Sequence, residues 1–456
     1  MTQQNGGLTD APLIAWYADD FTGAAAVMEV LTFAGLPTML FLEPPTLDQL
    51  AKYPGLKGIG VASTARAQSP EWMDAELPVA FGQLAALNPG LMHYKVCSTL
   101  DSSPLVGSIG RAIDIGAQIH APAAVPVLIA APQMRRYQSF GNLFAGFGDD
   151  VFRLDRHPVM SRHPVTPMHE SDVAKHIALQ SDKIDARCMT MEDMSLSAHL
   201  PKTAADPDRI EVVTLDCIDA NTESAAGRLI WEGRETSPFV VGSQGIEYAL
   251  VRHWQETGQI GKVAAPQGIG RSDRMIVVSG SVSPITAEQI TWAAANGFAC
   301  IAFDATCACQ DKGALEQEEG RIVTACLDAI AQGQDPLVFT AEGPDDPAVE
   351  AFKTAAGSET ATANQKTGEA LGRILHQTLL QSNVRRAVVS GGDTSGHATR
   401  QLGIYALTAL APTIPGAALF QAHADGPMDG LQLALKGGQM GSHDYFGWIR
   451  NGGGPQ

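Results

Sequence analysis

Short apolar runs alternate with helical patterns along most of the chain, and each run ends in a polar or glycine-rich cluster. In the first half, the runs that predict buried strands are 13–17, 38–42, 58–62, 91–96, 125–131, 210–215 and 238–242. In the second half, they are 275–279, 298–303, 336–340 and the start of 387–403. This alternation is typical of βαβ units, so we expect an α/β fold of mainly parallel sheets flanked by helices.

One segment interrupts the alternation of strand and helix patterns. Residues 254–274 lose their periodicity and gain glycine, glutamine and proline, as linkers between domains do. The length of 456 residues also suits two domains better than one. We therefore predict an N-terminal domain at 1–253, a linker at 254–274 and a C-terminal domain at 275–456.

The end of the first strand carries two adjacent carboxylates, Asp19 and Asp20, ahead of a helix at 22–34 that Gly35 stops. The carboxyl ends of parallel strands face the ligand crevice of an open α/β sheet. Adjacent carboxylates repel each other and are costly to desolvate, which favours a functional role for the pair. The alternative is that Asp20 only caps the helix.

Cations and hydroxyls come after other strands of the first half. Arg66 and Lys95 lie at predicted strand ends, where they could hold a substrate carboxylate or charge on a γ-phosphate. A solvated surface lysine is the alternative for Lys95. Arg135 and Arg136 could close over an anion or simply be exposed, and of the two we assign Arg135 to the substrate site. Donors and acceptors for a polyhydroxylated ligand come from Ser98, Thr99, Asp101 and Ser102.

Glycine-rich loops mark the second half. The segment 387–403 reads as a strand, a Gly-Gly-Asp-Thr-Ser-Gly loop and a short helix, and 433–446 holds a second glycine-rich loop next to a lysine. Glycines let a phosphate approach backbone N–H groups at a helix N-terminus. Together with Ser-Gly-Ser at 279–281, these loops predict a nucleoside triphosphate site. A tight turn with an aspartate cap is the alternative for the first loop alone.

Composition excludes some classes of binding partner and indicates where the protein works. The formal net charge of −18 argues against nucleic acid, and no apolar run reaches the length of a membrane span. The seven scattered cysteines favour reduced thiols and a cytoplasmic protein. Residues 141–169 look like a long irregular loop, and the spacing of His157, His163 and His169 matches no familiar zinc motif, so we expect no metal ligated there.

Six motifs in order resemble one family. They are ADDFTGA (18–24), YKVCSTLDSSP (94–104), TPMHESD (166–172), SGSVSP (279–284), SGGDTSG (390–396) and LKGGQMG (435–441). With them the chain resembles the four-carbon acid sugar kinase family, which are ATP-dependent kinases of short sugar acids. The resemblance implies a sugar-acid-binding N-terminal domain, a nucleotide-binding C-terminal domain and an active site in the cleft between them. It also implies Mg2+ and these ATP contacts: Ser281, Ser283, Gly391, Gly392, Asp393, Thr394 and Gly438. Asp393 could alternatively reach the Mg2+ through water.

Phosphoryl transfer needs an oriented nucleophile, cations on the transferring phosphate and a cradle for the nucleotide. We assign Asp20 to accept the hydroxyl proton, Asp19 to orient the substrate or a metal-bound water, and Lys95 as the third catalytic residue. The two aspartates could exchange roles, because a coupled pair shares its titration.

Two substrates fit the resemblance: a tetronate or 3-oxo-tetronate, and a branched acid such as 3-oxo-isoapionate. The apolar first helix and the PEWMD stretch at 70–74 favour the branched acid. A non-catalytic sugar-acid sensor on the same fold is the rival from another class. A nicotinamide dehydrogenase is disfavoured, since no Gly-x-Gly-x-x-Gly comes after a strand. A homodimer is one possible assembly.

Overall fold

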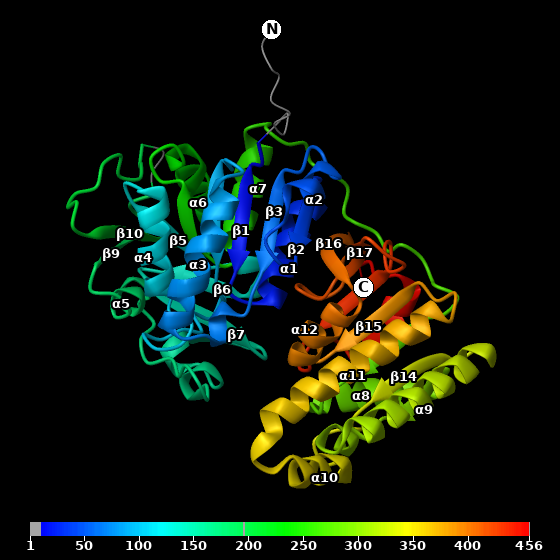
Figure 1. Ribbon diagram of the computed structural model, residues 1–456. Helices are drawn as coiled ribbons and strands as arrows, with labels where there is room; N and C mark the ends of the chain where they lie inside the picture. Colours follow the sequence, from blue (N-terminus) through cyan, green and yellow to red (C-terminus); the bar gives the residue numbers. More distant parts are fainter. Residues whose placement is uncertain (1–10, 195–196, 456) are drawn as a thin grey trace. The chain divides into compact units, whose positions relative to one another are not determined.

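The computed structural model describes residues 11–194 and 197–455, except for the side chain of Asp393. The chain forms two compact units that divide between Ala264 and Ala265. Each unit is an α/β sheet flanked by helices, so the predicted two-domain α/β fold is confirmed (Figure 1). The division lies inside 254–274, although residues 254–256 still belong to the last helix of the first unit.

The described strands of the first sheet are all parallel to one another. Their order across the sheet is β2 (Thr38–Phe41), β3 (Gly58–Ala62), β1 (Ile14–Ala18), β4 (Leu91–Lys95), β11 (Phe239–Gly242), β5 (Val125–Leu128), β10 (Ile210–Leu215) and β9 (Ile184–Met189). Ala18 lies opposite Ala62 on one side and Lys95 on the other. The carboxyl ends of β3, β1 and β4 are therefore level, and the loops that leave these strands share one edge of the sheet.

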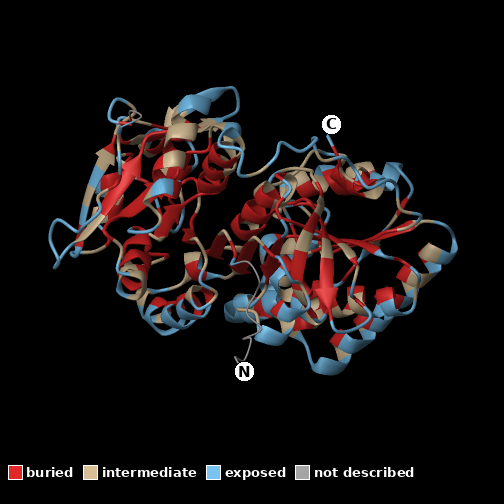
Figure 2. Ribbon diagram, turned by 90° about the horizontal axis from the view of Figure 1, so that it is seen from above, coloured by how far each residue is buried: buried red, intermediate tan, exposed pale blue. Residues whose placement is uncertain are grey.

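Helices cover both faces of this sheet, which is why its strands read as continuous apolar runs. Figure 2 shows the strands buried beneath more exposed helices. One packed group is α1 (Phe21–Phe33), α6 (Ala220–Gly233) and α7 (Gly245–Glu256); the other is α3 (Pro70–Ala85), α4 (Ile109–His120) and α5 (Val173–Ala178). The short helix α2 (Leu47–Ala51) comes after β2. Gly35, with φ +87°, ends α1 in a conformation that favours glycine.

The prediction of an irregular loop over 141–169 was wrong for its first part. An antiparallel sheet forms there from β6 (Arg136–Ser139), β7 (Asn142–Phe147) and β8 (Asp150–Arg153). Its tight turn at Gly148 has φ +56°. The 3-10 turns η3 (Leu154–Arg156) and η4 (Met160–Arg162) come next. The Nδ1 atoms of His157 and His163 accept backbone N–H groups in this segment, so both rings stabilise local turns.

The second sheet is mixed. Its order is β13 (Phe298–Ala302), β14 (Asp335–Phe339), β12 (Ile276–Ser279), β15 (Arg386–Ser390), β18 (Gln432–Lys436), β17 (Leu419–Ala424) and β16 (Ile404–Ala411). The first five are parallel, whereas β17 runs antiparallel to both β18 and β16. The sequence interpretation did not anticipate this β16–β17 hairpin.

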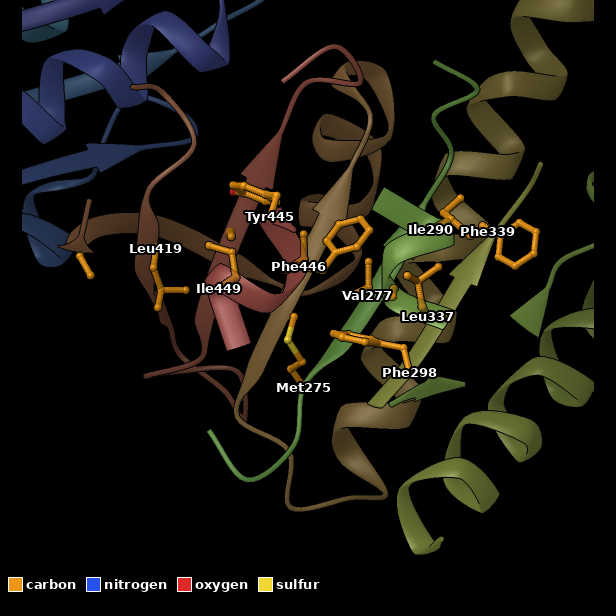
Figure 3. Packing of buried hydrophobic residues seen from close by; sticks show 14 residues of the cluster. Met275, Val277, Ile290, Phe298, Leu337, Phe339, Leu419, Tyr445, Phe446 and Ile449 are labelled. Atoms are coloured by element: carbon orange, nitrogen blue, oxygen red, sulfur yellow. The ribbon is translucent and has the colours of Figure 1, made fainter. Parts of the chain in front are cut away.

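Helices also pack on the second sheet. The helices α8 (Pro284–Ala295) and α13 (Tyr445–Asn451) pack together, as do α9 (Lys312–Ala331), α10 (Pro347–Ala356), α11 (Thr360–Leu380) and α12 (Gly392–Gln401). Figure 3 shows the core between the sheet and the α8–α13 pair, where Phe298, Tyr445 and Phe446 lie among aliphatic side chains. Full burial of such a side chain contributes about 1.5–3 kcal/mol. This packing holds β12 and β15, whose carboxyl ends carry the glycine-rich loops.

No helix in the described ranges is both long and apolar enough to cross a bilayer.

Candidate functional site

Asp19 and Asp20 lie where β1 turns into α1, and one arginine holds both. Arg66, in the 3-10 turn η1 (Ala65–Ala67), donates from Nε and Nη2 to Asp19 at 3.2 and 2.8 Å. Its Nη2 also donates to Asp20 Oδ1 at 2.8 Å. Burial raises the pKa of Asp19, although Arg66 opposes this. Although burial works against it, the charge of Asp19 raises the pKa of Arg66 well above its usual value, so the guanidinium stays charged.

Among the described residues, one oxygen of the Asp20 carboxylate accepts hydrogen bonds and the other meets no donor. Its Oδ1 accepts the N–H of Gly23 at 2.9 Å as the N-cap of α1 and also accepts Arg66. Within the described part of the chain, every hydrogen bond to the Asp20 carboxylate falls on this oxygen. The side chain is 25% exposed, whereas that of Asp19 is 4% exposed. Asp20 therefore caps the helix and still has Oδ2 available to a ligand.

Lys95 ends β4 as a buried side chain, so the alternative of a surface lysine was wrong. Its Nζ donates to the carbonyl of Val96 at 2.7 Å, and its own carbonyl accepts Asp19 N at 2.9 Å. A Cβ added to Gly23 would lie 2.5 Å from Lys95 Nζ and closer still to Asp20 Oδ1. Glycine at position 23 therefore lets the ammonium and the carboxylate approach each other across the first turn of α1.

The loop after Lys95 is fixed from within. Ser98 and Thr99 are buried, and Thr99 Oγ1 donates to Asp101 Oδ1 at 2.8 Å. Ser102 Oγ instead bonds the carbonyl of Leu100 and lies 3.0 Å from His176 Nε2. Burial lowers the pKa of His176 to about 4, so this imidazole is neutral at physiological pH. Ser102 thus ties the loop to α5, and its role as a substrate contact stays a prediction.

The two arginines after β5 have different surroundings. Arg135 reaches the turn between β7 and β8, where Nη2 donates to the carbonyls of Asp149 and Asp150 at 3.0 and 2.9 Å. Arg136 Nη1 donates to the carbonyl of Met134 at 3.1 Å, and its buried Nε has no partner in the described structure. Burial lowers the pKa of Arg136, and charge at Cys97 and Asp101 opposes the shift. The arginine close to the Lys95 loop is therefore Arg136, whereas the sequence interpretation had favoured Arg135 as the substrate ligand.

In the second unit, three loops meet at the carboxyl ends of β12, β15 and β18. Ser279 is level with Ser390, which is level with Lys436. Gly280 N donates to the carbonyl of Ser390 at 3.0 Å, and Gly391 N donates to that of Lys436 at 2.9 Å. We refer to the segments 279–283, 390–395 and 436–441 as the loop cluster.

Glycines shape the loop cluster. Gly391 has φ +123°, and a Cβ on Gly438 would collide with Ser281 Oγ. The helix α12 begins at Gly392, where an added Cβ would meet no protein atom within 4 Å. The first turn of α12 thus leaves room beside Gly392, and the N–H groups at a helix N-terminus are the kind of donors that an anion site uses. Thr394 is buried beneath Gly280 and Gly391, and the predicted contact Asp393 has a side chain outside the described part.

The two serines of the β12 loop have different tasks. Ser283 caps α8 by accepting Thr286 N at 3.1 Å, and its hydroxyl donates to the carbonyl of Gly438 at 2.5 Å. Ser281 Oγ accepts from Thr286 Oγ1 at 2.9 Å. The hydroxyl of Ser283 thus fastens two loops to each other, while Ser281 lies under Gly438.

Lys436 is the residue that the sequence interpretation missed as a functional side chain. It ends β18, is 1% exposed and donates from Nζ to the carbonyl of Gly437 at 3.1 Å and to Thr286 Oγ1 at 3.4 Å. No ion pair involves it among the described residues, and burial alone lowers its pKa to about 8. A buried lysine without a carboxylate beside a glycine loop is typical of a phosphate site. Its sequence signal was its place at the end of an apolar strand before Gly-Gly, like that of Lys95 at the end of β4.

Comparisons with known proteins agree with this arrangement. The model of a sugar-binding N-terminal domain matches residues 14–250, and that of a nucleotide-binding C-terminal domain matches residues 276–446. The chain is 44% identical to a protein of Paraburkholderia graminis named 3-oxo-isoapionate kinase, over 96% of this chain and 94% of that protein. It is 26% identical to a 3-oxo-tetronate kinase of Pseudomonas savastanoi pv. phaseolicola, over 95% and 96% of the two chains.

Solved structures share the fold. A protein of Salmonella typhimurium LT2 superposes with a TM-score of 0.73 at 23% identity, over 96% of this chain and 98% of the other. A Haemophilus influenzae protein superposes with a TM-score of 0.70 at 22% identity, over 96% and 99%. With both domain models matched in order and a relative at 44% identity along nearly its whole length, the chain belongs to the four-carbon acid sugar kinase family.

Proposed function

We propose that this protein is an ATP-dependent kinase that phosphorylates a hydroxyl of a short sugar acid, with 3-oxo-isoapionate as its substrate. The observation that carries the proposal is the 44% identity to a 3-oxo-isoapionate kinase, against about 26% for the 3-oxo-tetronate kinases. The apolar helix α1 and the PEWMD stretch favour the same acid. The sensor alternative is not favoured, because these relatives are named as kinases.

The first unit supplies the acceptor site. Asp20 Oδ2 takes the proton of the attacking hydroxyl. Arg66 holds the Asp19–Asp20 pair in place, so that this oxygen stays directed at the hydroxyl of the bound acid. Lys95 stabilises charge that develops near the reacting oxygen. Arg136 binds the carboxylate of the sugar acid, since its buried Nε lacks a protein acceptor in the described structure. Ser98, Thr99 and Asp101 remain the proposed partners of the substrate hydroxyls.

The second unit supplies the nucleotide site. The N–H groups at the start of α12 and the backbone at Gly438 cradle the phosphates, and Lys436 neutralises part of their charge. Mg2+ would supply further neutralisation of the phosphates when bound. Among the described residues, no three acidic, histidine or cysteine side chains group as a metal site. This fits an ion held mainly by phosphate oxygens and water, as Mg2+ often is.

Three further features belong to the proposal. Transfer requires the acceptor hydroxyl and the γ-phosphate to meet with water excluded, so an active site in a cleft between the domains stays a prediction. A cytoplasmic location and a homodimer likewise stay predictions.

The proposal is tested by measuring ADP release with purified protein over a panel of four- and five-carbon sugar acids. We expect the highest kcat/KM with 3-oxo-isoapionate. A preference for 3-oxo-tetronate would reassign the substrate within the family, and ADP release with none of the acids would contradict the kinase assignment.

The matched arginines test the carboxylate site. Arg136→Met is expected to raise the KM for the sugar acid by about ten- to a hundredfold, since hydrogen bonds to charged groups contribute about 1.5–3 kcal/mol. Arg135→Met removes the neighbouring guanidinium, which bonds the hairpin, and should change KM little. Steady-state kinetics with varied sugar acid gives both values. Equal effects of the two substitutions would show that Arg136 has no special role.

Lys436 makes nucleotide affinity depend on pH. Its pKa of about 8 lies below that of an ordinary lysine, so the uncharged form gains population as the pH rises through 8. The affinity of the wild-type protein for ATP should therefore fall above about pH 8. The Lys436→Met variant should bind ATP more weakly than the wild type, and its affinity should not change with pH in this range. For the same reason, the protein without nucleotide should gain stability between about pH 8 and 10.4, where the unfolded state binds more protons. Calorimetric titration of ADP at pH 7 to 9.5 checks the first effect, and a flat wild-type profile would contradict it.

A further inference from the structure

A hollow of about 350 Å3 lies at the amino ends of β12, β15 and β18 in the second unit. Three arginines line it, Arg274, Arg385 and Arg386, together with one carboxylate, that of Asp273. Its other described lining residues are Ser272, Ile330, Asn383, Val384 and Gln432. The formal net charge of the whole chain is −18, so this excess of positive charge is a local exception.

The hollow is separate from the loop cluster. The strand β15 begins at Arg386, which lines the hollow, and ends at Ser390, which belongs to the loop cluster. Four strand residues at about 3.3 Å each place roughly 13 Å between these two positions. The arginines therefore lie at the opposite edge of the same sheet from the proposed nucleotide site.

Arg386 is a buried cation without a carboxylate partner in the described structure. It is 3% exposed, and its Nη1 donates to the carbonyls of Gly270 and Arg450 at 3.0 and 2.9 Å. Its Nε donates to Gln432 Oε1 at 2.8 Å, whereas its Nη2 makes no hydrogen bond to any described residue. Burial lowers the pKa of Arg386, and no carboxylate opposes the shift. The charge of this guanidinium is thus left without a counterion.

The carboxylates near these strand ends do not fill that role. Asp335, the first residue of β14, accepts Met275 N at 2.9 Å through Oδ1 and Arg450 Nη1 at 3.2 Å through Oδ2. Met275 itself belongs to the core shown in Figure 3. Asp273 is exposed, and it is its backbone carbonyl that accepts Arg274 Nη1. Both oxygens of Asp335 are therefore occupied on the core side.

Further donors of the hollow also lack acceptors. The half-buried Arg274 uses neither Nε nor Nη2 in a hydrogen bond to a described residue. Arg385 donates to the carbonyls of Pro427 and Asp429 at 2.9 and 2.6 Å, but its Nε makes no such bond. The hydroxyl of Ser272 is buried and has no partner in the described structure. A buried polar group without a partner is costly, so the hollow is suited to a ligand that brings acceptors.

We propose that this hollow is an anion site, distinct from the nucleotide site, that binds a small molecule with a phosphate group through Arg274, Arg386 and Ser272. A phosphate monoester carries about −1.5 to −2 charge at pH 7 and three acceptor oxygens, which suits donors that come from several sides. Guanidinium groups match phosphate oxygens in geometry as well as in charge. The volume lies at the small end of the range of about 300–1,000 Å3 that is usual for ligand sites.

The position of the hollow indicates what a bound anion would do. Ser272 and Arg274 belong to the end of the linker between α7 and β12, whereas Arg386 begins β15. A phosphate held by both segments would fasten the end of the linker to the second unit. This inference does not depend on the proposed kinase function.

Calorimetric titrations of inorganic phosphate and of glycerol 3-phosphate test the proposal. Constant ionic strength is kept, and Mg2+ with a non-hydrolysable ATP analogue is present to fill the proposed nucleotide site. Arg274→Met should weaken binding at least about tenfold, as loss of a hydrogen bond to a charged group does. Asn383→Asp should also weaken it, because a new carboxylate at this exposed position of the wall repels the anion.

Arg271→Met is the matched control. Arg271 is an exposed arginine of the same linker segment, bonds Asn451 Oδ1 at 3.4 Å and is not among the described residues that line the hollow. This variant loses the same charge and should bind phosphate like the wild type. Tighter binding of glycerol 3-phosphate would identify a phosphate ester as the ligand, and tighter binding of inorganic phosphate would identify the free ion; both results support the site.

Two results would overturn the anion site. One is a wild-type protein that binds neither compound. The other is binding that Arg274→Met and Asn383→Asp leave unchanged, or that Arg271→Met weakens as much as Arg274→Met does. Circular dichroism checks that each variant is folded, and Asn383→Asp decides the question if Arg274→Met does not fold, since its side chain is exposed and similar in size.

Discussion

Replacing Asp20 by asparagine is expected to lower kcat by about a hundred- to ten-thousandfold, the usual contribution of a general base. The amide oxygen of asparagine can still accept Gly23 N, so the cap of α1 survives. The change replaces Oδ2, which meets no donor among the described residues and is proposed to accept the hydroxyl proton. Sugar-acid and ATP binding should remain, because the loss falls on the transition state.

A capping aspartate elsewhere provides the control for this substitution. Asp311 caps α9 by accepting Ala314 N at 3.0 Å, and Asp311→Asn should leave kcat unchanged. Thermal denaturation of both variants separates loss of the cap from loss of chemistry. If Asp20→Asn keeps most of its turnover, Asp20 is only a helix cap and Asp101 becomes the next candidate base. Asp19→Asn should also lower kcat, since it weakens the ion pair between Arg66 and Asp19 that orients the Asp20 carboxylate.

Gly392→Val is expected to weaken ATP binding by at least about a hundredfold, which is about 2.7 kcal/mol. An added Cβ meets no atom within 4 Å outside its own helical turn, so the side chain should occupy the space proposed for the phosphates while the fold survives. The backbone of Gly392 is not in the left-handed region, and valine can adopt it. Calorimetry with ADP measures the effect directly.

Gly396→Val is the matched control for the phosphate site. Gly396 lies one helical turn further along α12, is exposed and also has open space around an added Cβ. This variant should bind ADP like the wild type. Wild-type affinity in folded Gly392→Val would remove the start of α12 from the nucleotide site.

The parallel strands were predictable because a buried strand needs an apolar run with a polar boundary. The strand 58–62 was predicted with its observed bounds, and 210–215 likewise. The hairpin β16–β17 was missed although β16 (IYALTALA) is apolar except at Thr408, whereas Gln421 and His423 do interrupt the apolar run of β17. The β6–β8 sheet was missed because glycines and arginines dilute its short strands.

The site shows a different limit of prediction. Strand-end position was enough to bring Asp19, Asp20, Arg66 and Lys95 into one cluster, since the register of β3, β1 and β4 is level. Side-chain direction was not available from sequence, so Arg135 was chosen over Arg136 although adjacent side chains reach different partners. Burial was not available either, and it is burial without a carboxylate that distinguishes Lys436.

The most direct test of the kinase assignment is 31P NMR of the wild-type protein with Mg2+, ATP and 3-oxo-isoapionate. We predict that the resonances of ATP decrease while those of ADP and of one new phosphomonoester appear in equal amounts. The Asp20→Asn variant should form this phosphomonoester at least about a hundredfold more slowly. Inorganic phosphate in place of the phosphomonoester, or binding of both compounds without any new resonance, would contradict the kinase assignment.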